Sequence, residues 1–445
     1  MVRSMRTAII IINPFGEGGL LLSQIAIPYG TTHIDIEIDA NRLNGILISQ
    51  MSRYNPMAMP SQLVEQALEH PVGSPKLCEL ARGKKKVTII ASDHTRPVPS
   101  RILMPLMLGE IRQGNPAADI TILIATGCHR NTTKAELTDK FGEEIIAKEK
   151  IVIHDCDDDQ NMIPLGMLPS GGKLLLNRCA AESDLLIAEG LIEPHFFAGF
   201  SGGRKSVLPG VAARKTIMYN HNANFIDNPN ARAGILAGNP IHEDMSYAAR
   251  VANLAFIANV VINDEKKIVY AVAGDFEQAH FEGCRFLSNQ CCVQRKPADI
   301  VITSNGGYPL DQNIYQAVKG ITTAAATVNK NGVIIMFAKS DDGAGAEGFY
   351  RTFQQEKSLE RILARFRATP KEETIPDQWQ SQIFAMILQY ATVIYLSDAP
   401  DTMVREFHMV PAHSFAEAME KALTILKKSH ASVTVIPDGV SVIVT

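Results

Sequence analysis

Short runs of β-branched and apolar residues alternate with longer segments of helical spacing along the first part of the chain. Residues 86–91 read KVTIIA and residues 119–125 read DITILIA, whereas the apolar positions of 100–112 recur as on one face of a helix. Further strands are expected at 150–154 and 184–188. This alternation is typical of βαβ units and predicts a parallel sheet covered on both faces.

A second βαβ series begins near residue 299, with strands expected at 299–303 and 332–336 and a helix at 314–319. A charged, cysteine-bearing stretch at 289–297 separates the two series. Because 445 residues are too many for one ordinary core, two domains are expected. We predict an α/β fold of two domains with parallel or mixed sheets and the active site in the interdomain cleft. The predicted boundaries are 1–294, with 1–24 as an extension, and 295–445.

Composition excludes several classes of protein. Hydrophobic residues make up 46% of the chain and charged residues 20%, as in compact globular proteins. The net charge is -4 and no basic block occurs, so nucleic acid is not an expected partner. The apolar run 8–12 is too short for a signal peptide, and no stretch reaches the roughly 18 apolar residues that span a bilayer. Seven cysteines without paired spacing favour reduced thiols and a cytoplasmic enzyme.

Polar motifs follow three of the expected strands, at 92–96, 126–130 and 189–195. In open α/β sheets the ligand binds beyond the carboxyl ends of the strands, so these motifs should converge on one cleft. The first motif contains Asp93, Thr95 and Arg96. Its guanidinium and short polar side chains suit a carboxylate or phosphate, although a capped helix start is an alternative reading.

The richest segment runs from residue 193 to 210 and holds four glycines together with Ser201, Arg204 and Lys205. Its backbone N–H groups could face an anion, as in phosphate-binding turns. It is not a P-loop, because that motif requires glycine directly before the lysine and Arg204 stands there. A purely structural glycine turn is the alternative.

Histidines supply the remaining candidate chemistry of the first half. His129 and His195 follow different expected strands, and two imidazoles facing one cleft could serve as general acid and base near neutral pH. His221 is a candidate metal ligand, but no partner with familiar spacing accompanies it, and a zinc site needs at least three protein ligands. His154 and the aspartates of 155–159 could hold a hard cation or form a solvated turn.

The second half offers Tyr315, Gln316 and Lys319 on the helix expected at 314–319. Tyr315 and Lys319 are four residues apart, so they share a helix face and could both reach a ligand. Trp379, the single tryptophan, could cover a pocket or simply pack against its neighbours.

Taken in order, these segments resemble the nickel-pincer-nucleotide-dependent lactate racemase family, from residues 27–30 to the last strand. The resemblance implies that Lys205 carries the cofactor, a pyridinium-3-thioamide-5-thiocarboxylic acid mononucleotide, and that His221 binds Ni(II). In this family the cofactor supplies two sulfurs and a ring carbon, so one histidine completes a square plane. Residues expected around the cofactor are Asp93, Thr95, Gly202, Gly203, Tyr315, Gln316 and Trp379.

The resemblance also implies a reaction, the inversion of C2 of a small 2-hydroxy acid by hydride transfer to and from the cofactor. His129 and His195 would exchange the hydroxyl proton, Arg96 would clamp the carboxylate and Lys319 would polarise the oxygen. Lactate is the default substrate, with longer aliphatic, dicarboxylic and sugar acids as alternatives; Phe196 and Phe197 favour an uncharged tail. Cofactor-synthesis proteins are the partners expected during maturation, and no membrane partner is expected.

Other functions are compatible with the same residues. A cofactor-free racemase could use His129 and His195 as two bases that exchange the C2 proton directly. A non-catalytic protein could store or sense the nucleotide, although storage would require neither histidine. A phosphotransferase ranks third, because the segment 193–210, which contains Lys205, departs from the P-loop pattern.

Overall fold

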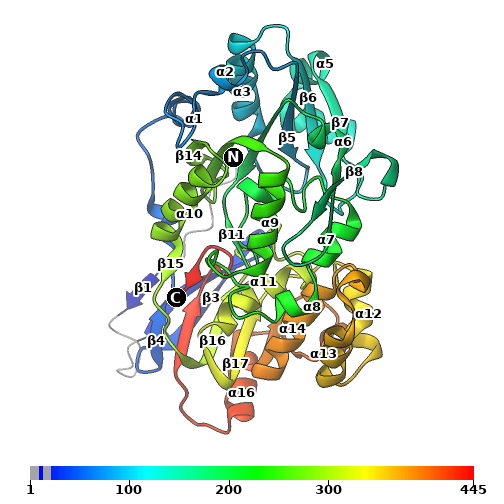
Figure 1. Cartoon of the computed structure of the whole chain (residues 1–445). Coiled ribbons are helices and arrows are strands. Elements are labelled where there is room, and N and C mark those ends of the chain that lie inside the picture. The colour runs from blue at the N-terminus through cyan, green and yellow to red at the C-terminus, as the bar shows by residue number, and fades with distance from the viewer. Residues whose placement is uncertain (1–9, 14–21) are drawn as a thin grey trace. The chain divides into compact units, whose positions relative to one another are not determined.

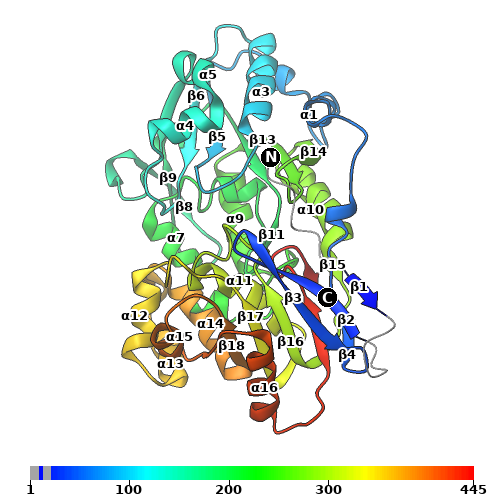
Figure 2. The ribbon, with the colours of Figure 1, turned by 180° about the vertical axis from the view of Figure 1, so that it is seen from behind.

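The computed structural model describes residues 10–13 and 22–445, and the chain divides into two compact units (Figures 1 and 2). Unit 1 comprises Met1–Ser52, Gln290–Pro370 and Thr374–Thr445, and unit 2 comprises Arg53–Asn289 and Lys371–Glu373. Both units are α/β, as the sequence predicts. Within the described residues, no helix is long and apolar enough to cross a membrane.

Unit 2 is built on a six-stranded sheet of order β14-β13-β10-β5-β6-β7. All neighbouring strands are parallel except β13 and β14. Every residue of β10 is buried, because a parallel sheet covered on both faces requires almost continuous apolar strands. The four strands predicted for the first half are confirmed. The sheet consists of β5 (Lys86–Ser92), β6 (Asp119–Ala125), β7 (Lys150–Ile153), β10 (Leu185–Leu191), β13 (Leu254–Ile262) and β14 (Ile268–Gly274).

Helices and short ribbons complete unit 2. Apolar residues of α1 and α3 pack into the same core as β5 and β6, which buries one face of the sheet. The helices are α1 (Pro60–Glu69), α2 (Leu77–Leu80), α3 (Ser100–Gly114), α4 (Lys134–Phe141), α5 (Glu143–Lys148), α6 (Arg178–Ala181), α7 (Arg214–Asn220), α8 (Ala223–Ile226), α9 (Pro240–Val251) and α10 (Gln278–Cys291). The ribbons are β8 (Met162–Met167) with β9 (Lys173–Asn177), and β11 (Pro194–His195) with β12 (Gly199–Phe200).

Unit 1 has its own six-stranded parallel sheet of order β19-β18-β17-β16-β20-β4. The strands and helix predicted for the second half are confirmed in it. The sheet consists of β4 (Leu43–Ile46), β16 (Ala298–Ser304), β17 (Val328–Phe337), β18 (Thr392–Leu396), β19 (Val410–Ala412) and β20 (Val433–Ile436). Its helices are α11 (Ile314–Ala325), α12 (Glu347–Gln355), α13 (Leu359–Ala368), α14 (Gln378–Tyr390), α15 (Asp401–Glu406) and α16 (Phe415–Leu426).

The N-terminal segment differs from the predicted boundaries, which placed it in the domain of residues 1–294. Here β4 pairs in parallel with β20, far along the chain, so residues up to Ser52 group with unit 1. The antiparallel strands β1 (Ile10–Asn13), β2 (Leu22–Tyr29) and β3 (Thr32–Asp39) precede it. Part of the predicted extension 1–24 is therefore strand β1, paired with β2, while residues 1–9 and 14–21 lie outside the described residues.

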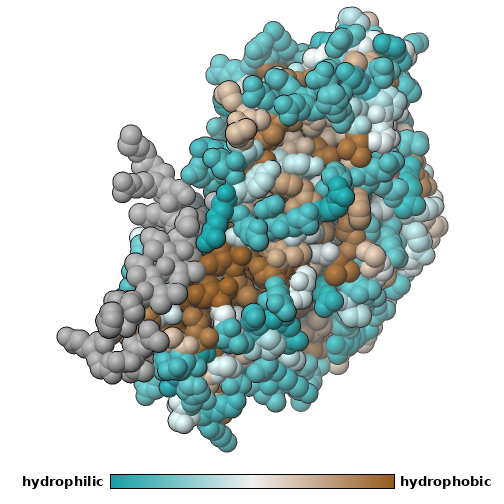
Figure 3. All heavy atoms as spheres, turned by 90° about the vertical axis from the view of Figure 1, so that its left-hand side faces the viewer, coloured by the Kyte–Doolittle hydropathy of each residue, from teal (hydrophilic) through white to brown (hydrophobic). Residues whose placement is uncertain are grey.

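Large hydrophobic side chains are exposed at separate places on the surface. Met57, Met59 and Phe281 are exposed in unit 2, and Tyr308 and Ile375 in unit 1. On the face drawn in Figure 3, hydrophobic residues gather in patches among hydrophilic ones. Exposed hydrophobic residues are common on protein surfaces and do not by themselves indicate a site.

Candidate active site

Buried Asp93 and exposed His129 form a carboxylate–imidazole pair at one edge of the unit 2 sheet. They follow β5 and β6, whose parallel pairing sets Ser92 opposite Ala125. His129 Nδ1 lies 2.7 Å from Asp93 Oδ2, and Thr95 Oγ1 donates to Asp93 Oδ1 over 2.6 Å. Burial alone would raise the pKa of Asp93, but the hydrogen bonds from His129 and Thr95 outweigh it and lower the pKa. The ionised carboxylate therefore accepts a hydrogen bond from the Nδ1–H of His129, which leaves His129 Nε2 without a proton and as the reactive atom.

Glu189 hydrogen-bonds to both ends of the segment from Ser92 to Ser100, which carries Asp93 and Arg96. Its Oε1 accepts hydrogen bonds from Ser100 Oγ at 2.8 Å and from Ser92 Oγ at 3.3 Å. The side chain is buried on β10, and this burial raises its pKa. Sequence reasoning assigned Glu189 no role, although a glutamate inside the apolar run of β10 is a signal of its own.

Arg96 is exposed beside this pair. One of its guanidinium nitrogens donates to Thr95 Oγ1 over 3.1 Å, and Lys140 Nζ donates to its backbone carbonyl over 3.4 Å. Its charge contributes to lowering the pKa of Lys205. The structure thus places a positive charge near both His129 and the lysine loop, as a clamp for a carboxylate requires.

The lysine loop, residues 193–210, brings Lys205 to His195. The β11–β12 ribbon sets His195 opposite Gly199, and Lys205 Nζ lies 3.3 Å from His195 Nε2. The Ala198 N–H donates to His195 Nδ1 over 3.3 Å, so the neutral imidazole carries its proton on Nε2. The Nε2–H can then donate a hydrogen bond to Lys205 Nζ only if the lysine amine is uncharged and acts as the acceptor. Burial, with the charges of Arg204 and Arg96, lowers the pKa of Lys205 well below its usual value, in agreement with this assignment.

Arg204 ties the lysine loop to two helices. Its side chain is 1% exposed and donates to the carbonyls of Ala198 and Gly202, at 2.8 and 3.2 Å. It also donates to His242 Nδ1 on α9 over 3.0 Å and lies 2.9 Å from His280 Nε2 on α10. Burial lowers its pKa to about 10, so the guanidinium still carries its charge at neutral pH.

The glycines of the loop are explained by packing. Gly202 and Gly203 have φ of 77° and 54°, and a Cβ on Gly203 would lie 2.8 Å from His280. The Gly203 N–H donates to Asn259 Oδ1 over 2.8 Å, the Ser201 N–H to the Glu193 carbonyl and the Lys205 N–H to the Gly202 carbonyl. Because these N–H groups are engaged within the protein, they do not form the anion cradle that the sequence suggested, and the structural reading of the glycine turn is favoured here.

His221 ends α7 and is buried, 5% exposed. Its ring meets the face of Phe197 edge-on at 5.2 Å between centroids, and Phe197 also packs edge-on against His195 at 4.5 Å. Burial lowers the pKa of His221 to about 3. The imidazole is therefore neutral at physiological pH, which is the state that binds a metal.

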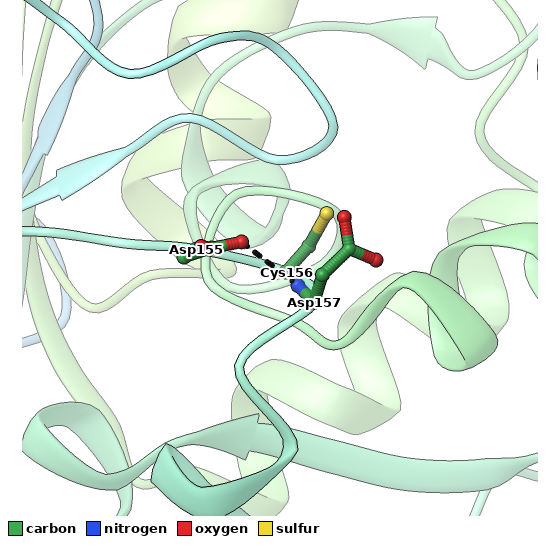
Figure 4. A group of neighbouring side chains, drawn as sticks. All are labelled: Asp155, Cys156 and Asp157. Atoms are coloured by element: carbon green, nitrogen blue, oxygen red, sulfur yellow. Dashed lines mark hydrogen bonds between the residues drawn. The ribbon is translucent and has the colours of Figure 1, made fainter.

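The aspartate-rich turn after β7 anchors the start of α7. Asp157 accepts two hydrogen bonds of 2.7 Å from Arg214, and Asp159 pairs with Lys215 at 3.0 Å. Ligand atoms of Asp155, Cys156 and Asp157 lie within 4.8 Å of one another (Figure 4). Asp157 is nevertheless engaged by Arg214, so the turn is better explained as a structural anchor than as a cation site. Buried His154 supports it, with Nε2 3.0 Å from the Ala212 carbonyl.

The remaining predicted residues lie in unit 1. The Tyr315 hydroxyl donates to Asp377 Oδ1 over 2.8 Å, and its carbonyl accepts from Gln380 on α14. Tyr315 and Lys319 are on α11, where their spacing places them on one face, and the Gln316 carbonyl accepts from Asn305 over 2.7 Å. Trp379 lies in the first turn of α14 and is half-buried.

Known proteins of one family are similar to this chain over almost its whole length. The model of the lactate racemase N-terminal domain matches residues 29–234, and that of the C-terminal domain matches residues 293–444. A lactate racemase of Thermoanaerobacterium thermosaccharolyticum is 51% identical over 424 residues, covering 95% of this chain and 99% of the relative. The chain belongs to the lactate racemase family. It is accordingly an isomerase of the racemase class.

Other members of the family agree with this assignment. The lactate racemase of Lactiplantibacillus plantarum is 52% identical over 94% of this chain and 99% of its own length. The solved lactate racemase apoprotein of T. thermosaccharolyticum matches with a TM-score of 0.92 at 52% identity, covering 95% of this chain and all of that one. A Thermotoga maritima protein with a TM-score of 0.58, at 16% identity over 87% of this chain and 97% of that one, shares the fold alone.

Proposed function

We propose that this racemase inverts C2 of lactate or a related short 2-hydroxy acid, with a nickel-pincer nucleotide attached to Lys205 and its Ni(II) bound by His221. The observation that carries the proposal is the meeting of Lys205 with His195 at 3.3 Å, with His221 buried on the other side of Phe197. Relatives named lactate racemase at about half identity support the substrate.

The residues fit the proposed cofactor. Acylation of a lysine requires the uncharged amine, and the hydrogen bonding of His195 together with the lowered pKa of Lys205 favours that form. His221 is a neutral, buried imidazole suited to Ni(II). In the described part of the chain, His221 belongs to no group of three metal-binding side chains, so a single protein ligand is consistent with a cofactor that supplies the others.

When bound, the cofactor would accept the C2 hydride of the substrate and return it. The two histidines would transfer the proton of the substrate hydroxyl, and their tautomers suit them to opposite roles. Asp93 keeps the proton of His129 on Nδ1, so Nε2 of His129 can accept a proton. The Ala198 N–H donates to Nδ1 of His195, so the proton of His195 is on Nε2 and can be donated from there. One histidine would act as base and the other as acid, with the roles exchanged for the other enantiomer.

Arg96 would bind the substrate carboxylate, because its exposed guanidinium, held by a hydrogen bond to Thr95 Oγ1, offers a fork that matches two carboxylate oxygens. Thr95 and Asp93 would support this end of the cofactor site. Roles for Lys319, Tyr315, Gln316 and Trp379 rest on the family resemblance.

The phenylalanines favour a small apolar substrate tail. Phe197 is 3% exposed and packs at a steep angle against both His195 and His221, which helps to fix the positions of these rings. Phe196 is half-buried and stacks on His195 at 5.3 Å, which leaves it as the apolar surface beside this histidine. A methyl group fits such a surface better than a second carboxylate does, so lactate is preferred over dicarboxylic acids.

The test is a chirality assay on protein purified from a host able to make the cofactor. Single enantiomers of lactate, a longer aliphatic, a dicarboxylic and a sugar 2-hydroxy acid are incubated with the wild type, Lys205→Ala and the control Lys85→Met. We expect racemisation of lactate by the wild type and the control and none by Lys205→Ala. Protein that carries the adduct and nickel but racemises no acid in the panel would contradict the proposal and favour a cofactor carrier.

A further inference from the structure

Two thiols meet beside the candidate catalytic His129. Cys128 directly precedes this histidine on the loop after β6, and Cys156 lies on the turn after β7. Their sulfurs are 3.9 Å apart, and both are free thiols. Cys128 is half-buried and Cys156 is buried, so a small reagent can approach the pair from the side of Cys128.

The fold keeps these two loops together. β6 and β7 are parallel neighbours, with Ile124 opposite Ile153, and neighbouring strands lie about 4.8 Å apart. Thr126 Oγ1 donates to the His154 carbonyl over 2.6 Å, which joins the two strand ends just before the cysteines. The sulfur contact is therefore a consequence of sheet register and not of two freely moving loops.

The surroundings make Cys156 the more reactive sulfur. The contact with Cys128 lowers the pKa of Cys156, and the charge of Arg214 acts in the same direction, against burial and the charges of Asp157 and Asp155. Figure 4 shows the Cys156 sulfur and the Asp157 carboxylate pointing to the same side of the turn, while the Asp155 carboxylate accepts the Asp157 N–H over 3.0 Å. Arg214, which binds Asp157 through two hydrogen bonds of 2.7 Å, is thereby held near the thiol.

We propose that Cys128 and Cys156 are a redox-sensitive pair that forms a reversible disulfide and thereby displaces His129. With hydrogen peroxide as oxidant, the Cys156 thiolate attacks one peroxide oxygen and the O–O bond breaks, giving a sulfenic acid and hydroxide, which takes up a proton to become water. The Cys128 sulfur, losing its proton, then attacks the sulfenic sulfur, forms the S–S bond and releases a second water. Two electrons pass from the sulfurs to the peroxide.

Bond formation would move the loop that carries His129. The sulfurs must approach from 3.9 Å to about 2.05 Å. Cys156 is fixed, because its carbonyl accepts the Arg214 N–H over 3.0 Å, so the exposed loop at Cys128 takes up most of the shift. The next residue, His129, then loses its 2.7 Å contact with Asp93. The disulfide itself does not depend on the proposed function, whereas its effect on racemisation rests on the role of His129 proposed above.

The experiment treats cofactor-loaded, full-length protein with hydrogen peroxide, blocks remaining thiols and maps the peptides by mass spectrometry. We expect a Cys128–Cys156 crosslink in the wild type, with the racemisation rate reduced about tenfold or more and restored by dithiothreitol. Cys128→Ser should form no crosslink and keep its activity under peroxide. Cys179→Ser, which removes another half-buried thiol of unit 2, should respond like the wild type.

The outcomes separate the parts of the proposal. Oxidation of exposed Cys292 without a Cys128–Cys156 crosslink would overturn the pair itself, whether or not the protein is a racemase. A crosslink that leaves the rate unchanged would overturn the displacement of His129. Equal loss of activity in the wild type and Cys128→Ser would trace the loss to the cofactor and would also overturn the switch.

Discussion

The amine of Lys205 lies 3.3 Å from Nε2 of His195, an imidazole whose Nδ1 already accepts the N–H of Ala198. A neutral imidazole has one proton, so Nε2 must donate and the lysine must accept. The contact therefore identifies Lys205 as an uncharged amine, and an uncharged amine is the form that can be acylated.

Lys205 should react with an acylating reagent at lower pH than other lysines. Its lowered pKa means that the neutral amine is already present at a pH at which an ordinary lysine, with a pKa of about 10.4, is protonated. Acetic anhydride labelling of the cofactor-free chain from pH 6 to 10, followed by peptide mapping, measures this directly. Exposed Lys85 is the internal control, and identical pH curves for the two lysines would refute the assignment.

Asp93→Asn should lower kcat for racemisation about 100-fold or more. The amide cannot stabilise a positively charged His129 and does not enforce the Nδ1–H tautomer. The matched control is Asp139→Asn on α4, an exposed aspartate, which should retain the wild-type rate. Steady-state rates in both directions check the prediction. Equal rates for Asp93→Asn and the wild type would remove His129 from the proposed proton transfer.

Gly203→Ala should destabilise unit 2 by about 2–4 kcal/mol, since the new Cβ meets His280 at 2.8 Å in a backbone with φ of 54°. Gly83→Ala shares a positive φ of 72° but has nothing within 4 Å, so it should cost only the roughly 1–2 kcal/mol of the left-handed conformation. Urea unfolding of the two variants compares packing with backbone strain. A smaller loss for Gly203→Ala than for Gly83→Ala would contradict the packing explanation.

Arg204→Met should lower the free energy of unfolding by about 3 kcal/mol, because it removes the hydrogen bonds of a buried guanidinium to the carbonyls of Ala198 and Gly202 and to His242. Arg101→Met on α3 removes exposed hydrogen bonds to Asp139 and Thr138 and should cost about 0.5 kcal/mol or less. Denaturant unfolding at neutral pH distinguishes the two. Unchanged stability of Arg204→Met would show that the loop does not depend on this guanidinium.

Strands and helices that form from one continuous stretch of sequence could be predicted. The β-branched runs that became β5, β6 and β16 are continuous in sequence, and the polar motifs after β5 and β6 meet because parallel strands end at one edge. The pairing of β4 with β20 was not predictable, because strand partners far apart in sequence leave no periodic signal. The same holds for the loop contacts of Arg204, which depend on histidines contributed by α9 and α10.

The candidate site was predicted as a set of residues but not as a geometry. His195, Lys205 and His221 were linked through the family resemblance, and the structure adds that Phe197 packs between the two imidazoles. The sequence left the glycine turn open between an anion-binding loop and a structural turn, because it shows that N–H groups are present but not that Asn259 and Glu193 engage two of them. Which partner satisfies a backbone group is a tertiary property.

The central claim is that racemisation requires a nucleotide attached to Lys205. Its most direct test is the intact mass of active protein from a host that makes the cofactor, followed by mapping of the Lys205 peptide. The account predicts a chain heavier by one mononucleotide adduct, located on Lys205, with activity in proportion to the loaded fraction. An active chain of unmodified mass would contradict it and would favour direct proton exchange by His129 and His195.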